Sequence, residues 1–91
     1  NPFTSAVADS GNTVITVTEV THGRSSSDTV RFRTCDPFDG ISKSALELSS
    51  GYSITVVTTD TYTFTVAEAS TTGGIKGGGD FATAGPVTIT S

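Results

Sequence analysis

Residues 51–66, GYSITVVTTDTYTFTV, constrain the fold more than any other part of this chain, because apolar and polar side chains alternate along them. The side chains of the apolar series are Tyr52, Ile54, Val56, Tyr62, Phe64 and Val66. A period of two residues on both sides of a short polar turn predicts a β-hairpin with one buried face. Asp60 lies in the turn, where its carboxylate can accept hydrogen bonds from nearby backbone amides. The outward threonines are expected to pair across the two strands, which favours a sheet without adding charge.

Other segments of the chain also show strand patterns. Residues 29–34, TVRFRT, alternate in the same way, with Val30 and Phe32 inward and two arginines outward. Residues 12–20, NTVITVTEV, are strand-like, but an adjacent valine and isoleucine leave open either a bulge or burial on both faces. A sixth strand is expected around residues 3–7.

The last strand is predicted at residues 86–91, PVTITS, with Val87 and Ile89 inward and the proline at a strand's first position. These strands are joined by short links, which is typical of antiparallel sheets. We therefore expect an all-β fold: a small antiparallel β-barrel or β-sandwich of five to six strands, with at most one short helical turn.

The two longer connections carry different signals. In residues 35–51, Ser44 and Glu47 have the spacing of a helical capping box, and Leu46 and Leu48 would then plug one end of the sheet. The second connection contains the glycine clusters of residues 73–79, which predict a flexible, exposed loop.

Composition supports a folded β domain over a disordered chain. Charged residues are 15% and apolar residues 34% of the 91 residues, and serine and threonine make up about a third. Threonine is β-branched and favours strands, whereas disordered chains are rich in Pro, Glu, Lys and Gln. We expect one β domain over residues 1–91. Because the chain lacks methionine even at position 1, we expect it to be processed or excised from a longer protein.

Charge and cysteine content argue against several classes of function. The net charge is −4 with five basic residues, three of them at positions 24, 31 and 33, so no nucleic-acid partner is expected. No apolar run reaches about 18 residues, so no membrane span is expected. Cys35 is the single cysteine and, with one histidine, cannot build a zinc site. It is predicted to be a small buried side chain at a strand end.

The segment HGRSSSD, residues 22–28, contains the only histidine together with serines and an acid. A Ser-His-Asp site also requires an oriented base and an oxyanion hole, and no G-x-S-x-G pattern is present. Gly23 suits a loop that needs a positive φ, and Asp28 can cap the loop's end. His22 is therefore predicted to be architectural, and the chain is predicted not to be an enzyme.

The remaining candidate sites are also better explained by structure. Asp36 and Asp39 lack the spacing of a calcium loop and are predicted to cap a turn. The GGIKGGGD segment lacks the order of a phosphate-binding loop. Tyr52 and Tyr62 could stack on a sugar, but their phase points them into the core. No catalytic, metal or cofactor-binding residue and no cofactor is predicted.

A resemblance to a known family rests on the order of these motifs. The chain begins with NPFT and continues with a strand, THG, a small-residue loop, DTVRF, GIS…ALEL…GYSITVV, DTYTFTV and glycines. This order resembles a β module of tailed-bacteriophage virion proteins, some of which are similar to a small β-barrel half-domain of ubiquitin-activating enzymes. The likeness covers nearly the whole chain. The chain departs from the family pattern at Ser27, where the family often has glycine, and at Arg24, where the family often has leucine.

The resemblance implies a structural component of the virion, such as a tail, head-to-tail or capsid-decorating part. Its expected partners are other virion proteins and copies of itself, and its expected location is the virion. The rival hypothesis is a carbohydrate- or receptor-binding module at a fibre tip, which would use the 73–79 loop and exposed aromatic side chains.

Overall fold

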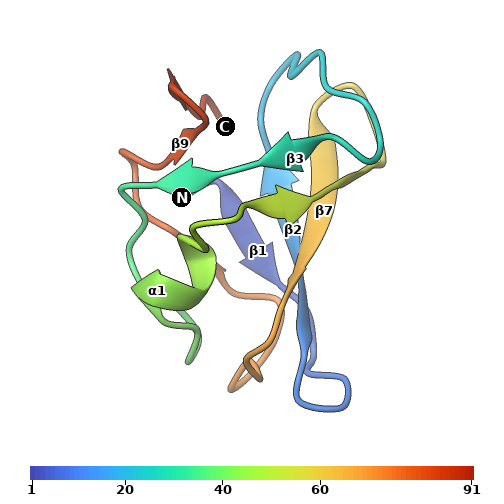
Figure 1. Cartoon of the computed structure of the whole chain (residues 1–91). Helices are drawn as coiled ribbons and strands as arrows, with labels where there is room; N and C mark the ends of the chain where they lie inside the picture. The colour runs from blue at the N-terminus through green and yellow to red at the C-terminus, as the bar shows by residue number, and fades with distance from the viewer.

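The computed structural model describes residues 1–91 and contains ten short strands and one helical turn, α1 (Figure 1). The strands are β1 (Phe3–Ser5), β2 (Thr13–Thr18), β3 (Thr29–Val30), β4 (Phe32–Arg33), β5 (Tyr52–Ser53), β6 (Thr55–Val56), β7 (Thr61–Val66), β8 (Lys76–Gly77), β9 (Thr83–Ala84) and β10 (Val87–Thr88). The helical turn α1 spans Lys43–Leu46. The all-β prediction is confirmed.

Three antiparallel sheets make up the fold, and none of them closes into a barrel. The main sheet has five strands in the order β6-β7-β2-β1-β8. A three-stranded sheet, β10-β9-β4, and the pair β3-β5 complete the structure. In Figure 1 the β3-β5 pair lies across β2 and β7, so the apolar face of the main sheet is covered by the shorter strands.

The central pair of the main sheet, β2 and β7, follows the predicted alternation. Ile15 pairs with Phe64 and Val17 with Tyr62, and all four side chains point into the core. Val14 is 42% exposed, so β2 is a regular strand with one buried face, without a bulge or burial on both faces. The threonines between these residues point to the other face of the sheet.

The predicted hairpin over residues 51–66 forms, but its first arm is broken. Val56 pairs with Tyr62 in the hairpin, whereas Tyr52 leaves the main sheet and pairs with Val30. The turn itself is held by Thr58, whose hydroxyl accepts from the Asp60 amide at 3.2 Å. The Asp60 carboxylate accepts from the Thr21 amide in the neighbouring loop, at 2.8 Å.

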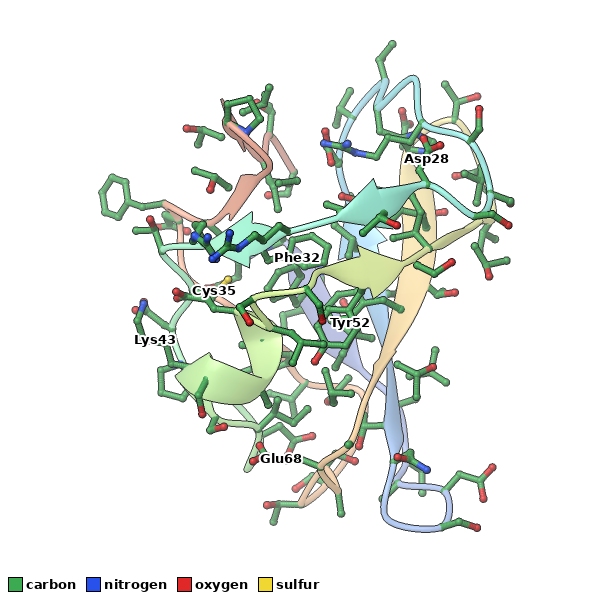
Figure 2. The ribbon with its side chains drawn as sticks, viewed as in Figure 1. Asp28, Phe32, Cys35, Lys43, Tyr52 and Glu68 are labelled. Carbon is green, nitrogen blue, oxygen red and sulfur yellow. The ribbon has the colours of Figure 1, made fainter.

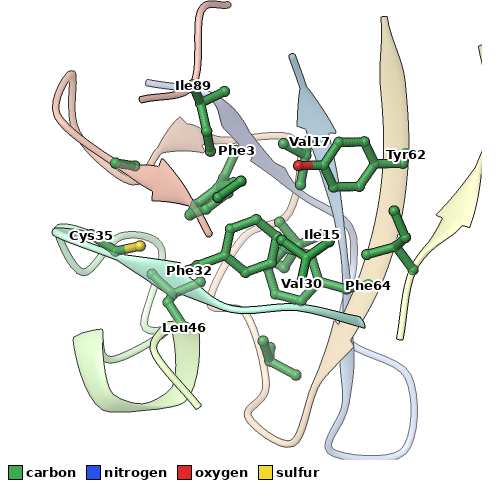
Figure 3. Close-up of a cluster of buried hydrophobic side chains, with 14 of the residues drawn as sticks. Phe3, Ile15, Val17, Val30, Phe32, Cys35, Leu46, Tyr62, Phe64 and Ile89 are labelled. Carbon is green, nitrogen blue, oxygen red and sulfur yellow. The ribbon is translucent and has the colours of Figure 1, made fainter. Parts of the chain in front are cut away.

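Aromatic rings join the layers of the core (Figure 3). Phe3 from the main sheet packs edge-on against Phe32, with the ring centroids 5.3 Å apart. Phe32, from the covering layer, stacks on Phe64 with the centroids 4.6 Å apart. Val30 and Phe32 are buried as predicted. Burying large aromatic side chains contributes most to a core of this size.

The helical turn differs in detail from its prediction. The N-cap is Ser42 and not Ser44: the Ser42 hydroxyl accepts from the Ala45 amide at 3.1 Å. Glu68 fixes Ser42 in that position, because its carboxylate accepts from the Ser42 amide at 2.7 Å. Leu46 is buried as expected, but Leu48 follows the end of the turn and is 40% exposed.

Residues 74–76 of the glycine segment 73–79 are exposed as predicted, but its last part is packed against the core, where the prediction of an exposed loop is wrong. Gly77 and Gly78 are buried, and β8 pairs with β1. A Cβ atom at Gly77 would lie 2.3 Å from the Phe38 side chain, and one at Gly78 would lie 2.4 Å from the Phe3 ring. Glycine is needed here because backbone and aromatic rings approach too closely for any side chain.

The C-terminal strand is shorter than predicted. β10 pairs with β9 at the rim of the molecule, and the Ile89 amide donates to the Ala82 carbonyl. Ile89 is buried, but Val87 is 55% exposed, so its predicted inward position is wrong. At the free edge of a small sheet, a side chain on the inner face extends past the core.

Candidate functional site

A densely bonded polar cluster lies where β2 ends. The odd-numbered residues of β2 face the core, and this phase continues to Glu19, which is 7% exposed. The Tyr62 hydroxyl donates to Glu19 Oε1 at 2.5 Å. Arg24 Nε donates to the same oxygen at 3.1 Å, and Arg24 Nη2 donates to Oε2 at 3.3 Å. A buried carboxylate needs such compensation, since an unpaired buried charge is costly.

The surroundings keep Arg24 charged and Tyr62 protonated. Burial, followed by the hydrogen bond to Glu19, raises the pKa of Tyr62. Burial alone would lower the pKa of Arg24, but the hydrogen bond to Glu19 and the nearby charges outweigh it, and the pKa is raised. The Arg24 guanidinium lies 5.7 Å from the centre of the Tyr62 ring and donates to the Ala84 carbonyl at 3.2 Å. This cluster ties the 19–24 loop to β7 and β9.

His22 uses both ring nitrogens within the fold. The Arg24 amide donates to His22 Nδ1 at 2.9 Å, so the ring proton is on Nε2, which donates to the Thr58 carbonyl at 2.7 Å. The ring packs edge-on against Tyr62 with centroids 5.2 Å apart. With both nitrogens engaged, the ring has no free position from which to act as a general base.

Asp28 and the serines of the same loop also serve the backbone. The Asp28 carboxylate accepts from the Ser25 amide at 2.9 Å, as predicted for a loop cap. The Ser26 hydroxyl accepts from the Val56 amide at 3.0 Å. Ser27 has a φ of 74°, in the left-handed region that favours glycine. No hydrogen bond joins the histidine to Asp28 or to a serine hydroxyl, so the three residue types do not form a triad.

A cleft of about 410 Å³ borders this cluster. Its polar lining includes Glu19, His22, Arg24 and Asp28, and its apolar lining includes Val87. The charge of Arg24 is matched by Glu19, and the histidine nitrogens are occupied. The Asp28 carboxylate has no oppositely charged partner, so the cleft carries one uncompensated negative charge.

Asp39 acts as a turn residue, as predicted, whereas Asp36 lies outside that turn. The Asp39 carboxylate accepts from the Ser5 hydroxyl at 2.6 Å and from the Gly73 amide at 2.8 Å. The Ser5 hydrogen bond is the main reason that the pKa of Asp39 is lowered. Figure 2 shows Asp28 and Glu68 at opposite ends of the molecule, and no three His, Cys, Asp or Glu side chains lie close enough together to hold a metal ion.

Cys35 and the two tyrosines belong to the core. Cys35 is fully buried, and burial, with the Glu47 charge as a second cause, raises the pKa of its thiol to about 12. Tyr62 is fully buried, and Tyr52 is half-buried with its ring 4.8 Å from that of Phe64. The Tyr52 hydroxyl donates to a backbone carbonyl of α1. Neither ring is free to form a sugar-stacking platform, as their phase predicted.

Sequence reasoning missed Glu19 as the centre of the polar cluster. The signal was present, because an acid continues the inward phase of a strand and an arginine follows five residues later.

No helix of the structure has the length and apolar character needed to cross a membrane. Comparison with protein-family models, with curated proteins and with solved structures finds no match for this chain.

Proposed function

We propose that this chain is a non-enzymatic structural module of a tailed-bacteriophage virion that acts through protein–protein contacts. The observation that carries the proposal is the ordered series of motifs, from NPFT through DTVRF to the glycine segment, which resembles virion β modules. Ser27 supports it: the family often has glycine there, and this chain keeps a left-handed φ of 74° with a serine. The departure in sequence thus leaves the glycine-like backbone in place.

The use of the polar side chains also supports a structural role. His22, Arg24, Asp28 and Asp39 each hold a loop through hydrogen bonds to backbone or to a buried partner. Catalysis would require one of them to be free to exchange a proton or attack a substrate. A module whose polar groups fix its own loops is suited to presenting a constant shape to neighbours.

The rival hypothesis, a glycan-binding module, depends on exposed aromatic side chains. Phe81, 76% exposed, is the one strongly exposed aromatic residue, since both tyrosines face the core. Sugar-binding sites combine an apolar platform with convergent polar groups in a concave pocket. Phe81 does not line any of the three clefts on the surface, so contact with a protein is the better explanation of this ring.

The test is quantitative mass spectrometry of purified phage particles whose genome encodes this chain. We expect the chain in many copies per particle, in a fixed ratio to the major capsid or tail protein. Absence from purified particles would overturn the proposal. Binding of the isolated chain to a glycan array, lost in Phe81→Ala, would establish the rival function instead.

A further inference from the structure

The face of the main sheet that points away from the core carries a regular array of threonines. We define the threonine face by Thr4, Thr16, Thr18, Thr55, Thr61 and Thr63. Four of these residues form one row across β1, β2, β7 and β6, and the other two form the next row on β2 and β7. Neighbours in a row lie about 4.8 Å apart and the rows are about 6.6 Å apart, which are the repeats of a β-sheet.

The array is chemically self-complementary. Each threonine presents a methyl group and a hydroxyl that can both donate and accept a hydrogen bond. A second array of the same kind can therefore match it, whereas an array of one charge or of acceptors alone would not. Symmetric contacts between copies require a surface that is complementary to itself.

The threonine face carries very little charge. None of the nine acidic residues lies in any strand. The one charged side chain in the main sheet is Lys76 on the edge strand β8, which pairs with Thr4 and so stands at the end of the first row of the threonine face. Since the chain has a net charge of −4, two copies repel each other over most of their surfaces. They meet at the least electrostatic cost through the threonine face.

The edges of the main sheet are poorly suited to pairing with another chain. Edge strands β6 and β8 are two residues long, and β8 carries Lys76, a feature that blocks edge pairing in natural sheets. The Ser26 hydroxyl also occupies the Val56 amide on β6. Self-contact through these edges is therefore disfavoured.

We propose that the threonine face is a contact surface for a second copy of this chain, with the two sheets packed face to face. The inference deepens the proposed function, because it names the surface through which copies in an assembly meet. The five strands cover about 300 Å² at about 3.3 Å per residue and 4.8 Å per strand. A standard interface uses about 800 Å² per partner, so a single pair of faces binds weakly. In an assembly, many such contacts act together, and avidity then strengthens the binding between copies.

The first experiment is sedimentation of the whole 91-residue chain up to millimolar concentration. Wild type should show weak, reversible self-association. Thr16→Lys with Thr63→Lys places like charges at the centre of the contact and should raise the dissociation constant at least about tenfold, which is about 1.4 kcal/mol. Ser49→Lys with Ser50→Lys is the matched control, because it makes the same charge change on an exposed loop outside the face.

A second measurement does not depend on any variant folding well. In wild type, amide shifts in nuclear magnetic resonance spectra should change with concentration on the strands of the threonine face and not around α1.

A strict monomer at millimolar concentration overturns the inference. Equal weakening by both lysine pairs, or shift changes centred elsewhere, also overturns it. Because these experiments use the isolated chain, their failure leaves the virion location to be decided by mass spectrometry of particles.

Discussion

Arg24→Leu tests whether the buried polar cluster stabilises the fold. The substitution removes both hydrogen bonds from the guanidinium to Glu19 and the bond to the Ala84 carbonyl. Glu19, with its side chain 9% exposed, keeps the Tyr62 hydroxyl but loses its countercharge. Leucine can fill the space without supplying charge.

Removing one partner of a buried ion pair costs about 3–5 kcal/mol. The lower end applies here, because 20% of the Arg24 side chain reaches solvent and water screens the pair. A cost of about 3 kcal/mol is a large part of the net stability of such a domain, which is of order 5–10 kcal/mol. For a chain of this size, it lowers the melting temperature by roughly 12–24 °C.

The assay is urea unfolding followed by circular dichroism at neutral pH. Arg31→Leu is the control, because it removes an exposed arginine and should change the free energy of unfolding by about 0.5 kcal/mol or less. Adding Glu19→Gln to Arg24→Leu removes the unpaired charge and should recover at least half of the loss. A loss below about 1 kcal/mol for Arg24→Leu, or no recovery in the double variant, would refute the reasoning.

Three further predictions concern the loops and the C-terminus. Gly77→Ala places a methyl group against an aromatic ring and should cost about 1–3 kcal/mol; an unchanged urea midpoint would contradict this. The Ser5 hydrogen bond lowers the pKa of Asp39 in the folded state. The ionised carboxylate therefore stabilises the fold at pH values above its unfolded pKa of about 3.9, and this stabilisation is lost as the pH falls through the folded pKa. Asp39→Asn should therefore flatten stability between neutral and acid pH, as urea titrations can measure. Truncation after Gly85 removes the burial of Ile89, about 1.5–3 kcal/mol, and should abolish or sharply lower cooperative melting; melting at nearly the original temperature would count against it.

The strands were predictable because their side chains alternate. Along β7, Tyr62, Phe64 and Val66 are buried as the pattern required, and Val30 and Phe32 on the covering strands are buried as well. Period-two alternation is a local signal, so it identifies which side chains face the core. Alternation does not determine which strands pair with each other. For this reason the pairing of Tyr52 with Val30, outside the main sheet, could not be predicted.

The glycine segment shows why composition alone misled. Clustered glycines are typical of flexible loops, but glycine is equally required where backbone meets a side chain at close range. Only the fold brings Gly77 to Phe38 and Gly78 to Phe3, across more than thirty residues of sequence. Cβ contacts between distant segments have no local signature, so the packed role of this segment could not be predicted from the sequence.

The role of Glu19 depends both on local alternation along its strand and on contacts with residues distant in sequence. Its inward phase is local, because it continues the alternation of β2, but its partners come from a following loop and from β7. A buried acid in a small domain usually indicates either a reactive group or a structural one, and the difference lies in how its charge is compensated. Here Arg24 and Tyr62 satisfy the carboxylate, and His22 beside them donates and accepts within the backbone. Because these polar groups bond within the fold, we expect contacts with other molecules to use the exposed faces. Among these, the threonine face combines a regular array of side chains with very little charge.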